Sequence, residues 1–288
     1  MIQQLFWLID EAANLDDAHI EKVRALTTAV NLPLIIAVHR SRRHRQRRYW
    51  NQFNRDPLIV AQIEADYEVL QTKLKTAFHA VSMIDVDIED AAEQFLQNVQ
   101  AKSGLLILSY NSTSGMNYVL ATLEFTRHYP LPVLILTQRP WAKQPKLTVA
   151  VDPMHENPRP RHLDEVLINM QQFLRRKLKS QWSVLHCFWV PPALTTYREK
   201  IRQLHQESLT EFASDMGVPI DRIRLISGKP ENVIGEYVAV EKIDILLIGY
   251  VKRNPISQWW LGSTTISLLE NPPCDLLLIR GEPNAQAD

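Results

Sequence analysis

Cysteine and glycine are both scarce in this sequence. The 288 residues include only two cysteines, Cys187 and Cys274, too few for a disulfide framework and typical of a reducing compartment. Glycine occurs 8 times, so Gly-rich phosphate loops cannot be common. An excess charge is lacking too, because 32 Lys and Arg residues balance 32 Asp and Glu residues. Dedicated nucleic-acid-binding proteins are usually basic, so the balance argues against that class.

Long apolar stretches are also missing. No segment approaches the roughly 20 apolar residues that a membrane-spanning helix needs. The first residues, MIQQLFWLIDEAANLDD, have neither a basic start nor a long apolar core, unlike a secretory signal. We therefore expect a soluble, cytoplasmic protein with no membrane partner.

Common catalytic and metal-binding motifs are absent. The sequence has no G-x-S-x-G, no G-x-x-x-x-G-K-[ST], no G-x-G-x-x-G and no H-E-x-x-H. His186 and Cys187 are neighbours on a predicted strand, so their side chains point to opposite faces and cannot easily bind one metal ion. Cys187 is therefore predicted to be a packed core residue. No catalytic residue and no metal site is predicted.

Short apolar runs alternate with longer helical patterns along the chain. Runs of this length without polar alternation are typical of strands buried on both faces of a parallel sheet. The expected strands are residues 5–9, 33–38, 81–86, 105–108 and 133–136, then 147–151, 184–190, 223–226, 245–248 and 276–279. The expected helices include residues 57–80, 88–101, 162–178, 193–216 and 231–242. The order predicts an α/β fold of two tandem open doubly wound domains, each a five-stranded parallel sheet with helices on both faces.

The two halves of the sequence look like a repeat. Residues 8–10, 105–110 and 131–133 resemble residues 150–152, 245–250 and 272–274, at a nearly constant offset. The segment 139–145 contains two prolines and several polar residues, which suits a short linker. We therefore expect domains at residues 1–140 and 141–288.

A spaced glycine pattern follows the fourth expected strand of the second half. Asp244 opens that strand, Gly249 ends it, and residues 262–264 (Gly-Ser-Thr) stand further along. The pattern resembles the G-x2-G-x9-G-[ST] motif of the universal stress protein family. Asp152, after the first strand of this half, and residues 228–230 (Gly-Lys-Pro) resemble that family too. The two-domain layout is similar to its tandem-type members.

The resemblance implies a fold like that of the adenine-nucleotide alpha-hydrolases and a possible ligand. ATP-binding members of the family hold the nucleotide beyond the carboxyl ends of the strands, where doubly wound sheets bind ligands. The resemblance thus implies that ATP or a related nucleotide binds in the second domain. The implied contacts are Asp152, Gly249, Lys252, Gly262, Ser263 and Thr264.

Lys252 departs from the family motif, because it stands at the position of the second glycine. If that position needs a positive φ or bare backbone near a phosphate, lysine is unfavourable there. If its side chain swings outward, the ammonium group can pair with a phosphate. In the first half the motif is degenerate, with Ser109 replacing the first glycine, so no nucleotide is expected there.

Three function classes follow from these observations. The leading hypothesis is a non-catalytic, tandem-type stress-response factor that is gated by a nucleotide. The second is an interaction or regulatory module without nucleotide, and the third is a slow ATPase or nucleotidyl transferase. The family also associates through its fifth strand, so pairing of the two halves, or of two chains in a homodimer, is expected. The arginine-rich segment 40–48 favours a solvated loop over a nucleic-acid site.

Overall fold

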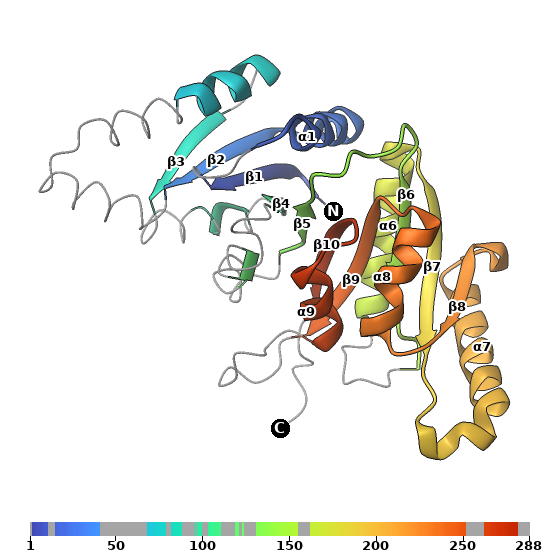
Figure 1. Ribbon diagram of the computed structural model, residues 1–288. Coiled ribbons are helices and arrows are strands. Elements are labelled where there is room, and N and C mark those ends of the chain that lie inside the picture. The colour runs from blue at the N-terminus through green and yellow to red at the C-terminus, as the bar shows by residue number, and fades with distance from the viewer. Residues whose placement is uncertain are drawn as a thin grey trace, which may run out of the picture. The chain divides into compact units, whose positions relative to one another are not determined.

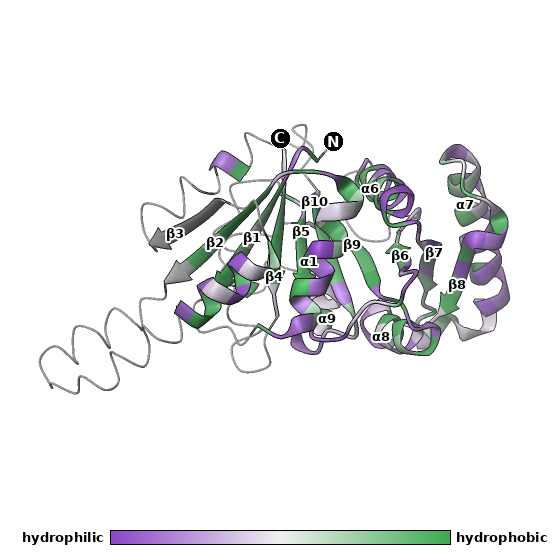
Figure 2. Cartoon of the chain, turned by 90° about the horizontal axis from the view of Figure 1, so that it is seen from above, coloured by the Kyte–Doolittle hydropathy of each residue, from purple (hydrophilic) through white to green (hydrophobic). Residues whose placement is uncertain are grey.

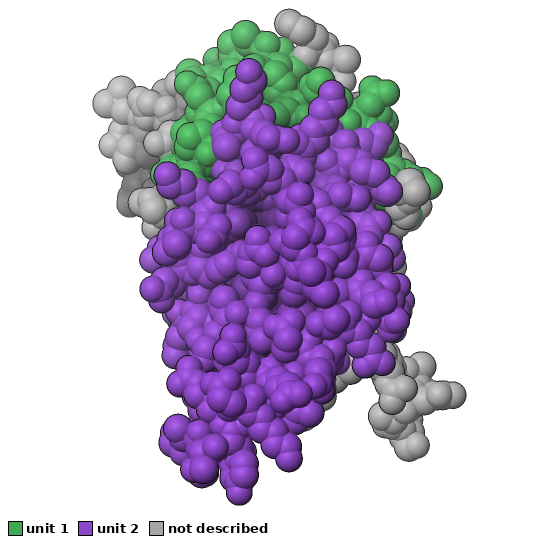
Figure 3. Space-filling view, turned by 90° about the vertical axis from the view of Figure 1, so that its right-hand side faces the viewer, with its two compact units in different colours: residues 1–140 green, residues 141–288 purple. Residues whose placement is uncertain are grey.

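The chain divides into two compact units, Met1–Pro140 and Trp141–Asp288, coloured separately in Figure 3. The computed structural model describes residues 2–10, 15–40, 68–78, 82–87, 95, 97–99, 103–110, 119, 120, 123, 131–154, 162–251 and 262–281. Lys252 and the arginine-rich segment beyond residue 40 lie outside the described residues, as does most of the helix expected at 88–101.

The first unit is built on five parallel strands (Figure 1). They are β1 (Gln4–Asp10), β2 (Leu34–Arg40), β3 (Ser82–Asp87), β4 (Gly104–Ser109) and β5 (Val133–Leu136), in the spatial order β3-β2-β1-β4-β5. Central β1 pairs Leu5 with Leu34 of β2 and with Leu105 of β4. Every residue of β4 and β5 is buried, as expected for strands without apolar–polar alternation.

Helix α1 (Asp17–Val30) of the first unit is fastened to the carboxyl end of β5. Asp16 caps the helix by accepting a hydrogen bond from the backbone N–H of His19, at 3.0 Å. The buried side chains of His19 and Lys22 then reach the end of β5. The Nε2 atom of His19 lies 3.2 Å from the carbonyl oxygen of Leu136, and the Nζ atom of Lys22 donates to that of Thr137 at 2.8 Å.

The second unit repeats this strand order. Its strands are β6 (Lys146–Ala150), β7 (Gln181–Phe188), β8 (Ile223–Ser227), β9 (Ile245–Val251) and β10 (Asp275–Gly281), arranged as β10-β9-β6-β7-β8 with all neighbours parallel. Its helices are α6 (Leu163–Leu178), α7 (Arg198–Asp215), α8 (Pro230–Glu241) and α9 (Ser263–Glu270), with 3-10 turns η2 (Pro192–Tyr197) and η3 (Ile220–Arg222).

Helices cover both faces of the second sheet. His186 and Phe188 of β7 contact the ring of His205 on α7, whereas Glu231 at the start of α8 acts on Cys187 between them. Because neighbouring side chains on a strand point to opposite faces, α7 and α8 lie on opposite sides of the sheet. Figure 2 shows α6 on the side of α7, and α9 on the side of α8. This arrangement follows from right-handed crossovers that start in opposite directions from β6 and β9.

Two buried aspartates fasten the beginning of the second unit. The carboxylate of Asp244, just before β9, accepts hydrogen bonds from the backbone N–H groups of Ala142 at 3.2 Å and Lys146 at 2.8 Å. The carboxylate of Asp275, at the start of β10, accepts one from the indole N–H of Trp141 at 2.7 Å. The chain therefore enters β6 in a path fixed by the amino ends of β9 and β10.

The predicted α/β doubly wound class is confirmed, with small shifts of element boundaries. The first strand of the second unit ends at Ala150 rather than at residue 151, so Asp152 stands two residues beyond it. The helix expected at 193–216 starts as the 3-10 turn η2 and continues as α7. Gly217 follows with a φ of +61°, the left-handed conformation that commonly ends a helix. Among the described helices, none has the length and apolar character needed to cross a membrane.

Candidate functional site

The candidate site lies where the connections of the second sheet diverge. The central strands β6 and β9 are neighbours, and Ala150 pairs with Ile248. The chain leaves β6 toward β7 on one side and leaves β9 toward β10 on the other. Divergence of this kind opens a crevice beyond the carboxyl ends of the two strands. Asp152 and Gly249 follow that Ala150–Ile248 pair closely in sequence, so both lie at this edge.

The start of α9 supplies potential anion ligands at the same edge. Gly262 is the N-cap, with φ −63° and ψ 154°, and no described side chain caps the helix. Ser263 is exposed and Thr264 is half-buried, and both lie in the first turn. The first backbone N–H groups of a helix have no intrahelical partner, and the helix dipole adds positive charge there. These groups suit a phosphate or another anion.

Gly262 is not required by the backbone or by packing. Its φ is an ordinary negative value, and a Cβ atom added there would meet no atom of the described residues within 4 Å. By contrast, Gly228 before α8 has a φ of +140°, and its added Cβ would lie 2.3 Å from Cγ1 of Val233. The backbone conformation and the packing therefore require glycine at residue 228. At residue 262 neither of them requires glycine.

Two carboxylates act on the thiol of Cys187 near this edge of the sheet. Burial, and after it the negative charges of Asp152 and Glu231, raise the pKa of the Cys187 thiol to about 12. Asp152 and Glu231 are thus close to one thiol, although they come from the end of β6 and from α8. The Oγ atom of Ser267, in the middle of α9, donates to the carbonyl oxygen of Glu231 at 3.2 Å. This hydrogen bond joins α9 to the first turn of α8.

The site therefore has hydrogen-bond donors at one end and acceptors at the other. Backbone donors at α9 attract an anion, and the carboxylates near Cys187 suit hydroxyl or amino groups of the same ligand. A nucleotide carries both kinds of group, so the described residues fit it. No group of three His, Cys, Asp or Glu side chains among the described residues could hold a metal ion.

Alkylation of Cys187 is expected to be slow. At pH 8, a thiol with a pKa of about 12 is ionised about a thousandfold less than one with the ordinary value of 9.0. The iodoacetamide rate, followed by peptide mass spectrometry, should rise about tenfold per pH unit from 7 to 10 because the thiolate is the reactive form. Glu231→Gln should accelerate the reaction, since it removes a negative charge. Equal rates in both proteins would show that Glu231 does not act on the thiol.

In the first unit, the residue that corresponds to Gly249 takes part in an internal hydrogen bond. The indole N–H of buried Trp7 donates to the Oγ atom of Ser109 at 3.0 Å, and Phe78 packs edge-on to Trp7 with ring centroids 6.0 Å apart. Ser109 stands where the second unit has Gly249. The serine thus serves an internal hydrogen bond at the end of β4, which agrees with the prediction that the motif is degenerate here.

Of the predicted site residues, the structure describes Asp152, Gly249, Gly262, Ser263 and Thr264, and all five lie at the carboxyl edge of the second sheet. The prediction that Cys187 is buried is confirmed.

Two side-chain contacts of the second unit were not predicted. The Nζ atom of Lys229 lies 4.6 Å from the ring centroid of Trp189, and Nε2 of His186 lies 2.8 Å from Nδ1 of His205. The sequence gives no signal for either pair, because each joins residues from different elements.

Comparison with known proteins agrees with this geometry. Residues 175–280 match the family described as the universal stress protein family. Universal stress protein E of Escherichia coli K12 is 26% identical over 165 residues, which cover 54% of this chain and 52% of that protein. Residues 175–280, which lie in the second unit, are therefore similar to this family. The chain spans about half the length of the curated relatives that it matches.

Solved structures have a similar fold over nearly the whole chain. A functionally unknown protein from Pseudomonas aeruginosa PAO1 aligns with a TM-score of 0.69 and 18% identity, covering 97% of this chain and 93% of that one. A putative universal stress protein from P. aeruginosa UCBPP-PA14 aligns with a TM-score of 0.68 and 19% identity, covering 97% and 94%. At such identities the likeness concerns the fold alone.

Proposed function

We propose that this protein is a non-catalytic, cytoplasmic stress-response factor whose second unit binds ATP or a related adenine nucleotide. The phosphates contact the backbone N–H groups and the hydroxyls of Ser263 and Thr264 at the start of α9. Asp152 accepts hydrogen bonds from the ribose or the base. Lys252, which lies outside the described residues, is proposed to pair with a phosphate. Bound nucleotide then changes how the protein interacts with its partners.

The observation that carries this proposal is the open backbone at Gly262. Neither a positive φ nor a close neighbour explains a glycine at this position. A ligand that approaches the first N–H groups of α9 does explain it, because a Cβ would stand in its way. The position of α9 at the divergence of the strand connections supports the same conclusion.

Gly262→Ala is expected to abolish or strongly weaken nucleotide binding without harming the fold. The added methyl group meets no described atom in the free protein, and alanine is a poorer N-cap than glycine, so the stability should fall by about 1 kcal/mol at most. Thermal shift in millimolar MgATP is the measurement. For the wild-type protein, ligand at about 100 times its Kd stabilises the fold by roughly 2.7 kcal/mol.

Gly235→Ala is the matched control, because this glycine also has open space around it but lies inside α8. It should leave the ATP-dependent shift unchanged. An unchanged shift in Gly262→Ala would place the nucleotide elsewhere. If the wild-type protein shows no shift and co-purifies with no nucleotide, the proposal is wrong.

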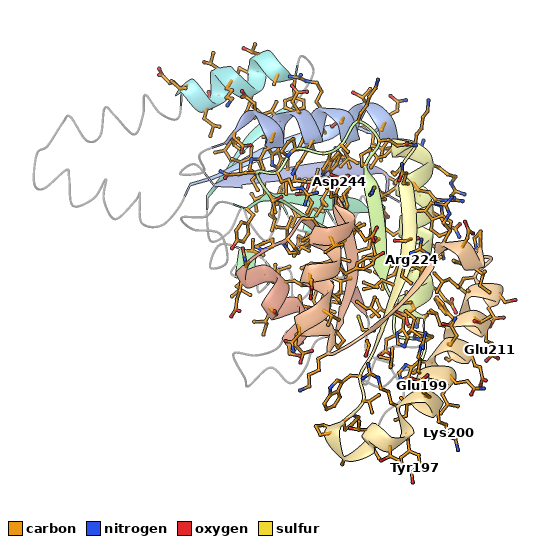
Figure 4. The ribbon with its side chains drawn as sticks, turned by 45° about the vertical axis from the view of Figure 1, so that its right-hand side comes forward. Tyr197, Glu199, Lys200, Glu211, Arg224 and Asp244 are labelled. Atoms are coloured by element: carbon orange, nitrogen blue, oxygen red, sulfur yellow. The ribbon has the colours of Figure 1, made fainter. Side chains whose placement is uncertain are left out.

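A second candidate function, an interaction module without nucleotide, is favoured by exposed apolar side chains. Leu194 and Tyr197 of η2 and Leu204 of α7 are 42%, 58% and 47% exposed. Figure 4 shows Tyr197 at the tip of η2, with Glu199 and Lys200 beside it at the start of α7. Apolar groups rimmed by charges are typical of protein contact surfaces.

Association of the two units, or of two chains, through the fifth strands β5 and β10 remains a prediction. Light scattering coupled to size exclusion, with and without MgATP, measures the number of chains. A mass that changes with the nucleotide would link binding to association.

A further inference from the structure

Trp189 is an exposed aromatic side chain at the carboxyl edge of the second sheet. It follows directly on β7, and 40% of its surface is exposed. Large aromatic side chains usually bury most of their surface, so an exposed ring at a ligand-binding edge needs an explanation. Lys229 holds this ring in place, with its Nζ atom 4.6 Å from the ring centroid. Such a cation–π contact favours this orientation of the indole.

Two independent links place Trp189 beside the candidate site. Along β7, Trp189 is two residues beyond Cys187, whose thiol senses the charges of Asp152 and Glu231. Along the next connection, Lys229 is the N-cap of α8 and stands two residues before Glu231. The backbone N–H of Gly228 also donates to the carbonyl oxygen of Phe188 at 2.8 Å, which joins the ends of β7 and β8.

The distance from Trp189 to α9 fits a nucleotide. The order β9-β6-β7 puts β7 two strands away from the strand that leads to α9, which corresponds to about 10 Å. A bound nucleotide would lie along this edge, with its phosphates at α9, its ribose near Asp152 and its planar base near Trp189. A nucleoside polyphosphate has the length and the order of groups to do so.

We propose that Trp189, held by Lys229, is the stacking surface for the base of the bound nucleotide. This inference rests on the proposed function, because it assigns the base end of the same ligand. The indole offers a flat π-surface to a heterocycle, and the nearby ammonium group polarises that surface. Stacking of this kind tolerates different bases, since each has a π-face. The affinity therefore depends on the presence of a base more than on its identity.

The test compares two ligands and two tryptophan variants by calorimetry. The ligands are ATP and inorganic tripolyphosphate, which has the phosphates but no base. Trp189→Leu is expected to weaken ATP binding about 10- to 100-fold and to leave tripolyphosphate binding within twofold. Trp189→Phe should recover most of the affinity for ATP.

Trp182→Leu is the control variant. Trp182 also belongs to β7 and lies under a cation, with the guanidinium carbon of Arg175 4.7 Å from its ring centroid. It is near the opposite end of the strand, roughly 20 Å away at the usual rise per residue. Its replacement should not change ATP affinity, and thermal melting confirms that both variants fold.

Three other outcomes would each contradict the stacking role of Trp189. If ATP binds the wild-type protein and Trp189→Leu equally well, the stacking role is wrong and the nucleotide site stands. If Trp189→Leu loses ATP and tripolyphosphate to the same extent, the ring supports the shape of the site and does not contact the base. If the wild-type protein binds no ATP, both the nucleotide site and the stacking role are wrong.

Discussion

Replacing Gly228 by alanine should destabilise the second unit by about 2–5 kcal/mol. Two penalties add in this substitution. A φ of +140° is strongly unfavourable for any residue with a Cβ, and the new Cβ would lie 2.3 Å from Cγ1 of Val233. Urea unfolding of the full-length protein, followed by circular dichroism and by hydrogen exchange at α8, measures the effect.

A double variant separates the two penalties. Val233→Ala removes the atom that the new Cβ would hit, so Gly228→Ala with Val233→Ala should recover the steric part and retain the backbone part. Gly235→Ala in the same helix gives the opposite sign, because alanine inside a helix is favoured over glycine by about 0.5–1 kcal/mol. If Gly228→Ala were as stable as the wild-type protein, the backbone conformation at residue 228 would be wrong.

Asp244→Ala should lower the free energy of unfolding of the second unit by about 2–4 kcal/mol, because it removes two hydrogen bonds to a charged group. The carboxylate is 4% exposed and accepts from the N–H groups of Ala142 and Lys146. Loss of these bonds releases the segment that enters β6. Hydrogen exchange at Ala142 and Lys146 should accelerate more than exchange in α7, which Figure 4 shows far from Asp244.

Asp221→Ala is the matched control for this prediction. Asp221 is exposed, and its ion pair with Arg222 measures 3.4 Å. Exposed ion pairs contribute between 0 and about 1 kcal/mol, so this variant should behave almost like the wild-type protein. If Asp244→Ala and Asp221→Ala lowered the stability equally, the carboxylate of Asp244 would not hold the chain entry.

Residues of one family motif can have different roles, either in holding the backbone or in binding a ligand. Asp244 and Gly228 both belong to the pattern that resembles the universal stress protein family, yet in this structure they hold the backbone in place. Asp244 lies at the amino ends of the strands, away from the crevice at their carboxyl ends. Gly262, whose φ and described surroundings do not require glycine, is the motif residue whose substitution tests the ligand directly.

The sequence by itself determined the α/β class and the position of most strands. β5 was predicted at residues 133–136, where the structure has it, because a short apolar run between polar segments has few other uses. The helix expected at 231–242 is likewise found as α8 (Pro230–Glu241), shifted by one residue at each end. Signals of this kind need no knowledge of distant residues.

Only the tertiary structure decided the surroundings of the site. Cys187 senses Asp152 and Glu231 because the end of β6 and the start of α8 meet at one edge of the sheet. Trp189 meets Lys229, and Trp7 meets Ser109, across gaps of 40 and 102 residues for the same reason. Such contacts depend on the strand order and on the face that each helix covers, and no local pattern along the chain encodes either one.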